Sequence, residues 1–450
     1  MASQRVICAC AVVLAGLVLG VAARSAPVPR LSFAGAQGLD FDKGFDGARD
    51  AETIASGNVS GDQTPDLVLG SFADRAVWLA IRKPQGGFAV ADGEQAVAGV
   101  PAGLALGDLD ADGRGDVAVA NGTGTKVVSV LLNEGGGFAR ADYATGASPQ
   151  GVAVADVNGD SRPDVVSANS SARTVSVLRN LGGGTLAPKA DYTTGPLPMA
   201  VAASDLNGDG RPDLVTANSG AATISVLRNR GSGTFGPRTD VVTGGAPNSV
   251  ALADFDGDGV LDVATANPRA RPARGVSVLL GRGDGTFRPR RDYPVSSNAS
   301  RITAADLNGD GRPDLALSEA GNLAVMLNRG DGTFEAPLWF GYGDAAAAAD
   351  FNLDGRIDLV GSWVNDRNGA WTVSAHLNTP GLCDVQSAVG KTLAAARQLL
   401  QRASCALGSV RRAYSARVAR GRVIRQSPRF PGSVIAGGGK VALVVSLGRR

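Results

Sequence analysis

Seven short acidic segments recur along the chain, and each carries oxygen-bearing side chains at alternate positions. The pattern is Asp-x-(Asn/Asp)-x-Asp-Gly-x-x-Asp, and the copies begin at residues 58, 108, 156, 205, 254, 306 and 350. Carboxylates held this close repel one another, and a hard cation that takes oxygen ligands removes the repulsion. The segments therefore predict calcium sites, with ligands at positions one, three, five and nine and a backbone carbonyl at position seven.

The copies differ in how many of these ligands they supply. Copies two, four, five, six and seven keep all four positions and a glycine at position six, whereas the third copy has Ser161 there. The first copy offers only Asn58, Ser60, Asp62 and Asp66, and we expect it to bind weakly. The expected ligands of copies two to seven are Asp108, Asp110, Asp112 and Asp116; Asp156, Asn158, Asp160 and Asp164; Asp205, Asn207, Asp209 and Asp213; Asp254, Asp256, Asp258 and Asp262; Asp306, Asn308, Asp310 and Asp314; and Asp350, Asn352, Asp354 and Asp358.

Turn chemistry is the alternative explanation for these residues, since Asn, Gly and Asp are frequent in tight turns. Turns do not require four oxygen-bearing side chains in register seven times, so we favour the metal. The segments also lack the glutamate that an EF-hand loop carries at position twelve. A cation held between two β-strands fits the pattern better. Since the loops are spread one per repeat, we expect calcium to stabilise the fold rather than to catalyse a reaction.

The acidic segments return every 44 to 52 residues, the size of one small supersecondary unit. In the fourth repeat, β-rich runs at residues 199–205, 214–218 and 223–229 precede a glycine turn and a further run to Val242. Runs of this length bounded by Gly, Asn, Asp and Pro predict four short strands and no helix. Seven such units predict a mainly β fold, a seven-bladed β-propeller of four-stranded blades over residues 26–378.

The last repeat lacks one strand. After the run at residues 371–377 the chain passes to Thr379 without the Gly-Thr-Phe segment that leads to the fourth strand elsewhere. The residues before the first repeat, around 31–45, have no repeat of their own. We expect them to complete the seventh blade and so to close the ring.

The segments at residues 205–213 and 254–262 resemble the calcium motifs of FG-GAP (VCBS-type) repeats, known from integrin α-subunit propellers and many secreted bacterial proteins. The resemblance covers about residues 30–378, where seven copies agree in spacing and in flanking strands. It implies a calcium-binding propeller that serves as a binding or adhesion module.

The first 25 residues have the composition of a secretory signal peptide. Arg5 precedes an apolar run from Val6 to Val21, which is followed by small residues suited to cleavage. An uncleaved anchor is the weaker alternative, because the run is shorter than the roughly 20 residues that span a membrane. We therefore expect a secreted protein with no membrane span in the mature chain. In an oxidising compartment, Cys383 and Cys405 are most simply paired in a disulfide.

The pattern changes at Cys383, after which the chain is strongly basic. Residues 383–450 hold 13 Lys/Arg and one acid, whereas the repeat region holds 29 basic and 41 acidic residues. A helical run over 391–403 and strand-like runs at 407–410, 422–426 and 441–446 predict a small α+β domain. Segments 421–428 and 441–446 resemble those of a PASTA domain, a module of cell-wall kinases and penicillin-binding proteins. The resemblance and the charge imply association with peptidoglycan or another anionic cell-wall polymer.

The sequence offers no recognisable constellation for catalysis. The single histidine, His376, lies in an alternating strand pattern, and Tyr143, Tyr192 and Tyr293 recur at equivalent repeat positions, which indicates packing. We expect a monomeric binding or adhesion protein, not an enzyme, whose partner is an extracellular glycan or protein and not a nucleic acid. A polysaccharide lyase or hydrolase on the same scaffold is the alternative, since fold does not fix function.

Overall fold

The structure is a computed structural model of the whole chain. It describes residues 37–38, 51–62, 64–83, 88–90, 93–268, 275–295, 299–319, 322–342, 345–364, 371–376, 378, 383–384, 389, 391–402, 406–415, 417–427, 434–435 and 440–447. The segment predicted as a signal peptide, residues 1–25, lies outside the described residues. Among the described residues, no helix is both long enough and apolar enough to cross a membrane.

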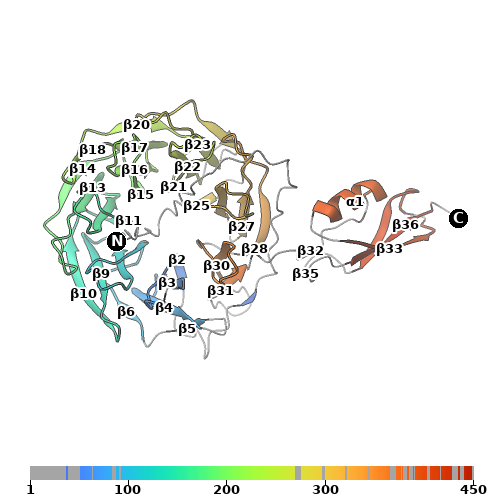
Figure 1. Cartoon of the computed structure of the whole chain (residues 1–450), viewed down its shortest axis with the longest axis horizontal. Coiled ribbons are helices and arrows are strands. Elements are labelled where there is room, and N and C mark those ends of the chain that lie inside the picture. Colours follow the sequence, from blue (N-terminus) through green and yellow to red (C-terminus); the bar gives the residue numbers. More distant parts are fainter. Residues whose placement is uncertain are drawn as a thin grey trace, which may run out of the picture.

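Seven antiparallel sheets of four main strands form a ring, as the repeat period predicts (Figure 1). The first four blades are β2 (Ala51–Gly57), β3 (Asp66–Ser71), β4 (Ala76–Arg82) and β5 (Phe88–Val90), with β6 (Gln95–Ala96) also paired to β4; β7 (Gly103–Gly107), β8 (Asp116–Ala120), β9 (Val127–Asn133) and β10 (Phe138–Ala144); β11 (Pro149–Ala155), β12 (Asp164–Asn169), β13 (Thr174–Leu178) and β14 (Ala190–Thr193); and β15 (Pro198–Ser204), β16 (Asp213–Asn218), β17 (Thr223–Leu227) and β20 (Thr239–Val242).

The last three blades keep the same order. They are β21 (Ser249–Ala253), β22 (Asp262–Ala266), β23 (Val276–Leu279) and β24 (Arg291–Tyr293); β25 (Ala299–Ala305), β26 (Asp314–Glu319), β27 (Asn322–Met326) and β28 (Leu338–Tyr342); and β29 (Ala345–Ala349), β30 (Asp358–Val364), β31 (Trp371–His376) and β1 (Gln37–Gly38). Between β17 and β20 the chain also forms a small hairpin of β18 (Asn229–Gly231) and β19 (Thr234–Phe235).

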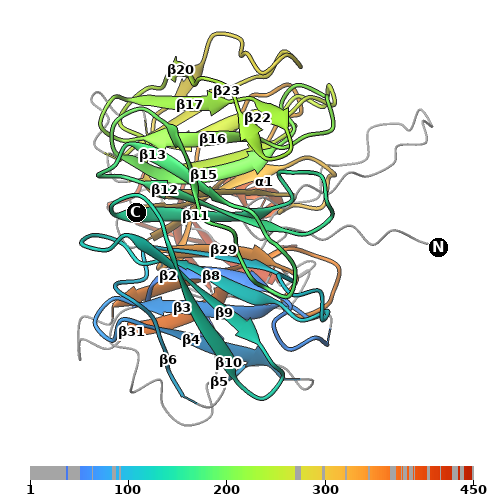
Figure 2. The same ribbon diagram turned by 90° about the vertical axis from the view of Figure 1, so that its left-hand side faces the viewer.

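The first strand of each blade lies beside the first strands of its two neighbours. The contacts run from β2 to β7, β11, β15, β21, β25 and β29, and then back to β2. These seven strands therefore make a closed inner ring, and the sheets extend outward from it. Figure 2 views the ring from its edge and shows β11 to β13 stacked against β15 to β17.

The seventh blade is completed by residues that precede the first repeat. Strand β1 pairs antiparallel with β31, with Gln37 opposite Ala375 and Gly38 opposite Ser374. This pairing agrees with the expectation that the N-terminal segment supplies the missing outer strand, although only these two residues of the segment are described. The ring is thus closed by a sheet built from both ends of the repeat region.

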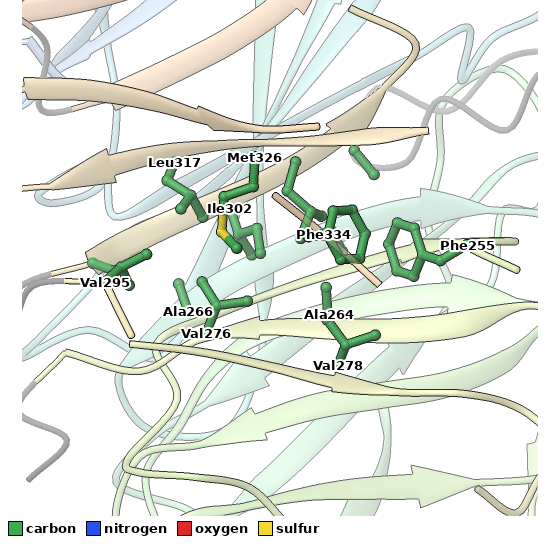
Figure 3. Packing of buried hydrophobic residues seen from close by; sticks show 14 of the residues in the cluster. Phe255, Ala264, Ala266, Val276, Val278, Val295, Ile302, Leu317, Met326 and Phe334 are labelled. Atoms are coloured by element: carbon green, nitrogen blue, oxygen red, sulfur yellow. The ribbon is translucent and has the colours of Figure 1, made fainter. Parts of the chain in front are cut away.

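The core lies between blades rather than at the centre of the ring. Figure 3 shows one junction, where side chains from blade five meet those from blade six. Phe255 and Phe334 meet edge to face with ring centroids 5.3 Å apart, and Met326 is fully buried beside them. Each blade is too thin to bury its own apolar face, so every blade depends on its neighbours.

A small α+β domain follows the propeller and lies outside the ring (Figure 1). Strand β36 (Lys440–Ser446) pairs in parallel with β33 (Ala406–Ala413) and antiparallel with β34 (Val423–Ser427). Helix α1 (Leu393–Arg402) contacts β33 and buries Ala396. A two-stranded sheet of β32 (Cys383–Asp384) and β35 (Val434–Ile435) completes the described part. The helix and the three longer strands agree with the predicted runs.

Candidate metal centres

Each acidic segment connects the first strand of a blade to the second. In blade two, for example, β7 ends at Gly107, the segment runs from Asp108, and Asp116 begins β8. Because all seven sheets share one strand order, the seven loops lie on the same face of the ring. The loops are separated by a whole blade from one another, as the repeat period requires.

The carboxylate at position one organises the turn of each complete loop. Asp205 is typical: its Oδ1 accepts the N–H of Gly208 at 2.8 Å, and its Oδ2 accepts that of Gly210 at 2.7 Å. The equivalent carboxylates accept N–H groups from their own loops in the same way, namely those of Asp108, Asp156, Asp254, Asp306 and Asp350. This bonding closes the loop into a compact ring of oxygen atoms.

The turn needs positive φ at two positions, of which the sequence analysis recognised only the second. At position six, φ is 79° at Gly210 and 67° at Ser161. At position four, φ is 74° at Gly208, and it is also positive at Ala111 (66°) and Leu353 (58°). Since non-glycine residues rarely adopt this conformation, the loops of blades two, three and seven carry some backbone strain. The recurrence of glycine at position four was the signal.

The aspartate at position nine is buried and fully hydrogen-bonded. In blade three, Asp164 is fully buried; its Oδ2 accepts the N–H of Val157 at 3.1 Å and its Oδ1 that of Asn180 at 2.7 Å. Five other blades repeat this pair of bonds, through Asp66, Asp116, Asp262, Asp314 and Asp358. Position nine is therefore a structural bridge between the loop and the third strand.

Burial raises the pKa of these carboxyl groups, because a charge in a poorly hydrated site is costly. The pKa rises to about 6 at Asp116, Asp164 and Asp358, and to about 7 at Asp262 and Asp314. The backbone N–H bonds oppose the shift, whereas the other loop carboxylates add to it. A cation in the loop would supply the positive charge that these buried groups lack.

The aspartate at position five faces an arginine from its own loop in three blades. Arg114 Nη1 lies 2.6 Å from Asp112 Oδ2, Arg211 Nη2 lies 2.6 Å from Asp209 Oδ2, and Arg162 pairs with Asp160 in the same way. These pairs are partly exposed, so each contributes little to stability. Position five is thus the predicted ligand that the structure holds by an alternative charge.

In two blades the structure brings three carboxylates to one point. Oxygen atoms of Asp108, Asp110 and Asp116 lie within 4.8 Å of one another, as do those of the equivalent set in blade five, Asp254, Asp256 and Asp262. The Oδ1 atom of Asp256 is also buried without a hydrogen-bond partner. Hard oxygen donors gathered in this way, with one oxygen unsatisfied, fit a divalent metal ion. The aspartates at position five, Asp112 and Asp258, are not part of these two clusters.

Comparison with known families decides the classification. A model of the FG-GAP-like repeat matches residues 108–167, 156–216, 205–265, 269–317 and 306–361, and a PASTA domain model matches residues 384–447. The chain belongs to the FG-GAP-like repeat family. The five matches begin at the second copy and so leave out the divergent loop at Asn58.

Solved structures share the fold of these FG-GAP-like repeats at low identity. BBS1N, crystallised in complex with ARL6DN, is 14% identical with a TM-score of 0.54, covering 78% of this chain and 99% of that one. A lectin from Agrocybe aegerita that recognises non-reducing terminal N-acetylglucosamine is 22% identical, with a TM-score of 0.46 and coverage of 65% and 81%. Virginiamycin B lyase from Staphylococcus aureus is 10% identical, with a TM-score of 0.47 and coverage of 72% and 99%. No curated protein matches the chain.

The first FG-GAP-like loop differs from the rest in its bonding. Asp62 accepts the backbone and side-chain groups of Thr64, and Asp66 accepts the N–H groups of Val59, Ser60 and Arg82. Asn58 accepts the N–H of Gly61, so it still closes the turn. With only two carboxylates, both engaged in these bonds, the loop keeps its shape without a third acidic oxygen.

A row of buried asparagines links the FG-GAP-like repeats, and the sequence analysis missed it. Asn180 donates through Nδ2 to the carbonyl of Leu109 in the loop of the preceding blade at 2.7 Å, while its own N–H binds Asp164. The bond to the preceding loop recurs at four other junctions, through Asn133, Asn229, Asn328 and Asn378. The sequence signal was an Asn that follows the third strand in most repeats. Each acidic loop is therefore tied to the next blade.

The three recurring tyrosines also join neighbouring FG-GAP-like repeats, as packing predicts. Their hydroxyls donate to a glycine carbonyl in the next blade, at 3.2 Å for Tyr143 and Gly184, 3.3 Å for Tyr192 and Gly233, and 3.5 Å for Tyr293 and Gly332. Cys405 and the side chain of Cys383 lie outside the described part, so the predicted disulfide stays a prediction. The side chain of His376 is likewise outside it.

Proposed function

We propose that this protein is an exported, calcium-stabilised propeller that acts as a binding or adhesion module and is held at a cell wall by its PASTA domain. The observation that carries the proposal is the pair of three-carboxylate clusters in loops that also bridge neighbouring blades. A cation placed there would join two strands of one blade and, through the bridging asparagine, the next blade. Such an ion stabilises a scaffold on which a ligand surface can be displayed.

Calcium is the cation that this donor set suits best. The loops offer carboxylate, amide and carbonyl oxygens in a flexible turn without imidazole or thiolate, which are preferred by zinc and copper. The ligands we assign are those at positions one, three and nine, joined by position five once calcium displaces the neighbouring arginine. Bound calcium would supply charge neutralisation and no redox or acid–base chemistry. Extracellular calcium modules of this kind bind at about 10⁻⁴ to 10⁻³ M.

The surface of the PASTA domain supports the proposed attachment to an anionic wall. Its described part exposes six arginines without an exposed acid beside them in sequence: Arg397, Arg411, Arg412, Arg417, Arg420 and Arg425. Cations spread over one small domain attract anionic polymers through a field that salt screens. The acidic propeller would be repelled by the same polymers and so would face away from them.

Sedimentation with cell-wall preparations tests the attachment. We expect the full chain to sediment with peptidoglycan carrying anionic polymers at low salt, and the variant Arg411→Gln/Arg412→Gln to sediment several-fold less. The control variant Arg230→Gln/Arg329→Gln removes the same charge from exposed positions of the propeller and should behave like the parent protein. Equal loss in both variants would leave only a nonspecific charge effect.

Thermal unfolding tests the role of calcium. Excess chelator should lower the melting temperature of the propeller, and millimolar calcium should restore it. An activity screen on polysaccharides accompanies both measurements, and turnover of any substrate would replace the binding role with the lyase or hydrolase alternative.

A further inference from the structure

An open groove of about 650 Å³ lies where the outer strand of blade four meets blade five. Its lining combines apolar side chains, among them Val241 and Phe287, with three arginines, Arg282, Arg288 and Arg290. One acidic residue, Asp292, lines it as well, and that carboxylate is already paired with Arg290 at 3.1 Å. The groove is thus apolar on one side and carries an excess of positive charge.

Arg288 belongs both to this groove and to the acidic loop of blade five. Its Nη1 lies 3.2 Å from Asp256 Oδ2 and its Nη2 lies 3.2 Å from Asp258 Oδ2. These two aspartates occupy positions three and five of the loop. The arginine therefore neutralises the carboxylates that we assign to calcium, and its side chain remains about half exposed toward the groove.

Blade five is built differently from its neighbours at this point. Blades two, three and four place an arginine at position seven of the loop, for example Arg211, where it pairs with the aspartate at position five. Blade five has Val260 at position seven, and Arg288 takes over the role from another loop. At the position equivalent to Arg288, blades three, four and six have Ala187, Gly236 and Glu335. The three-arginine groove is therefore a local feature, not a consequence of the repeat.

We propose that this groove binds a carboxylated saccharide and that calcium in the blade-five loop strengthens the binding by releasing Arg288. The inference deepens the proposed function, because it rests on calcium occupying that loop. Guanidinium groups bind carboxylates in a planar, two-bonded geometry, and the apolar side chains suit the C–H faces of sugar rings. An open groove at the rim of the ring accepts a segment of a polymer and not only its end.

The coupling follows from competition for the same oxygen atoms. Calcium bound to Asp256 and Asp258 neutralises them, and Arg288 then gains more from a uronate carboxylate than from its own loop. A coupling of this kind is reciprocal, so the saccharide must also raise the affinity of the loop for calcium. We expect a change of about tenfold in each direction, within the usual range for two linked sites.

Fluorescence anisotropy with a labelled hyaluronan tetrasaccharide, which carries two uronates, tests the proposal on the full chain. Binding should be about tenfold tighter in millimolar calcium than in chelator. The neutral chitin tetrasaccharide should not bind at this affinity. An acidic peptide of equal charge is the competing occupant, and tighter binding of that peptide would overturn the assignment to a saccharide.

Three variants separate the steps. Arg282→Gln should weaken binding about tenfold and keep the calcium dependence, while Arg288→Gln should weaken it and abolish that dependence. Val260→Arg restores the position-seven arginine of the other blades, so it should raise binding in chelator toward the value in calcium. Arg211→Gln is the matched control outside the groove and should change neither value.

The melting temperature of each variant, read with and without calcium, distinguishes two kinds of failure. Absence of any shift with calcium in the parent protein refutes the calcium sites themselves. A normal shift combined with equal tetrasaccharide binding in calcium and chelator, or with no binding at all, refutes the groove alone.

Discussion

At the scale of the residue, the aspartates of one loop have different tasks. Asp116 accepts two buried backbone N–H groups, from Leu109 and Asn133, whereas Asp110 accepts only the N–H of Asp112 in an exposed turn. Both belong to the same three-carboxylate cluster. Their substitutions should therefore separate the framework of the loop from its affinity for metal.

We expect Asp116→Ala to destabilise the propeller by about 3 kcal/mol in calcium and in chelator alike, because two buried N–H groups lose their acceptor. Asp110→Asn keeps an oxygen acceptor and removes one charge, so it should change stability in chelator by less than about 0.5 kcal/mol. In calcium, Asp110→Asn should lose part of the stabilisation. Urea unfolding under both conditions measures the differences, and equal losses for the two variants would contradict the division of tasks.

A second prediction at this scale concerns backbone strain. Leu353 has a φ of 58° at a position where five of the seven loops have glycine, and its side chain is 57% exposed. Leu353→Gly should stabilise the propeller by roughly 0.5 to 1 kcal/mol, since relief of the strained conformation exceeds the added chain entropy. The control Leu181→Gly changes a leucine that is 61% exposed in ordinary backbone and should be destabilising. Unfolding in calcium measures both, and destabilisation by Leu353→Gly would contradict the strain.

At the scale of the element, the bridging asparagines join one blade to the next. The Nδ2 of Asn180 donates to Leu109 of the preceding blade at 2.7 Å and to Pro163 of its own blade at 3.0 Å. Asn180→Ala should cost about 2 kcal/mol, because two buried carbonyls lose their donor. Thr234→Ala removes an exposed hydroxyl that bonds only within its own turn and should cost less than about 0.5 kcal/mol. Comparable costs in the two variants would argue against a structural bridge.

The elements themselves were largely predictable from the sequence, and the links between them were not. Alternating runs bounded by Gly, Asn and Pro predicted the strands of each blade and the acidic turn between the first two. The partner of Asn180, in contrast, lies 71 residues earlier in another repeat, and nothing local to the residue indicates that contact. For the same reason the sequence could not reveal that Arg288, from a distant loop, replaces the arginine missing at Val260.

Within the candidate site, the period predicted which side chains gather but not how they share the work. Burial of position nine and the pairing of position five with arginine depend on the third strand and on rotamers, which a motif does not record. The short hairpin of β18 and β19 in blade four was likewise not anticipated.

At the scale of the whole molecule, closure of the ring depends on the segment before the first repeat. Strand β1 covers the outer edge of β31, which would otherwise expose unpaired backbone groups. Removal of residues 26–45 should lower the melting temperature of the entire propeller, not of one blade, because all blades depend on their neighbours. Calorimetry on this deletion, with a chain that begins at residue 26 as control, measures the effect. Identical melting of the two chains would show that the segment does not close the ring.

The whole ring should also respond to pH in a way that depends on calcium. Five buried carboxyl groups have a pKa raised by burial to about 6 (Asp116, Asp164 and Asp358) or about 7 (Asp262 and Asp314). An unfolded aspartate has a pKa near 3.9, so these groups favour the folded state most below about pH 4. That contribution is lost as the pH rises through 6 and 7. Without metal, the propeller should therefore become less stable between pH 5 and pH 8.

Calcium binds the ionised carboxylates and should reverse this trend, because it lowers their pKa and displaces protons. The difference in melting temperature between calcium and chelator should widen steadily from pH 5 to pH 8. Taking the difference at each pH cancels the groups that titrate far from the loops, and magnesium at the same ionic strength controls for screening. A difference that stays constant over this range would mean that the buried aspartates are not coupled to the metal. A widening difference would place their ionisation, and with it the strength of the blade junctions, under the control of calcium.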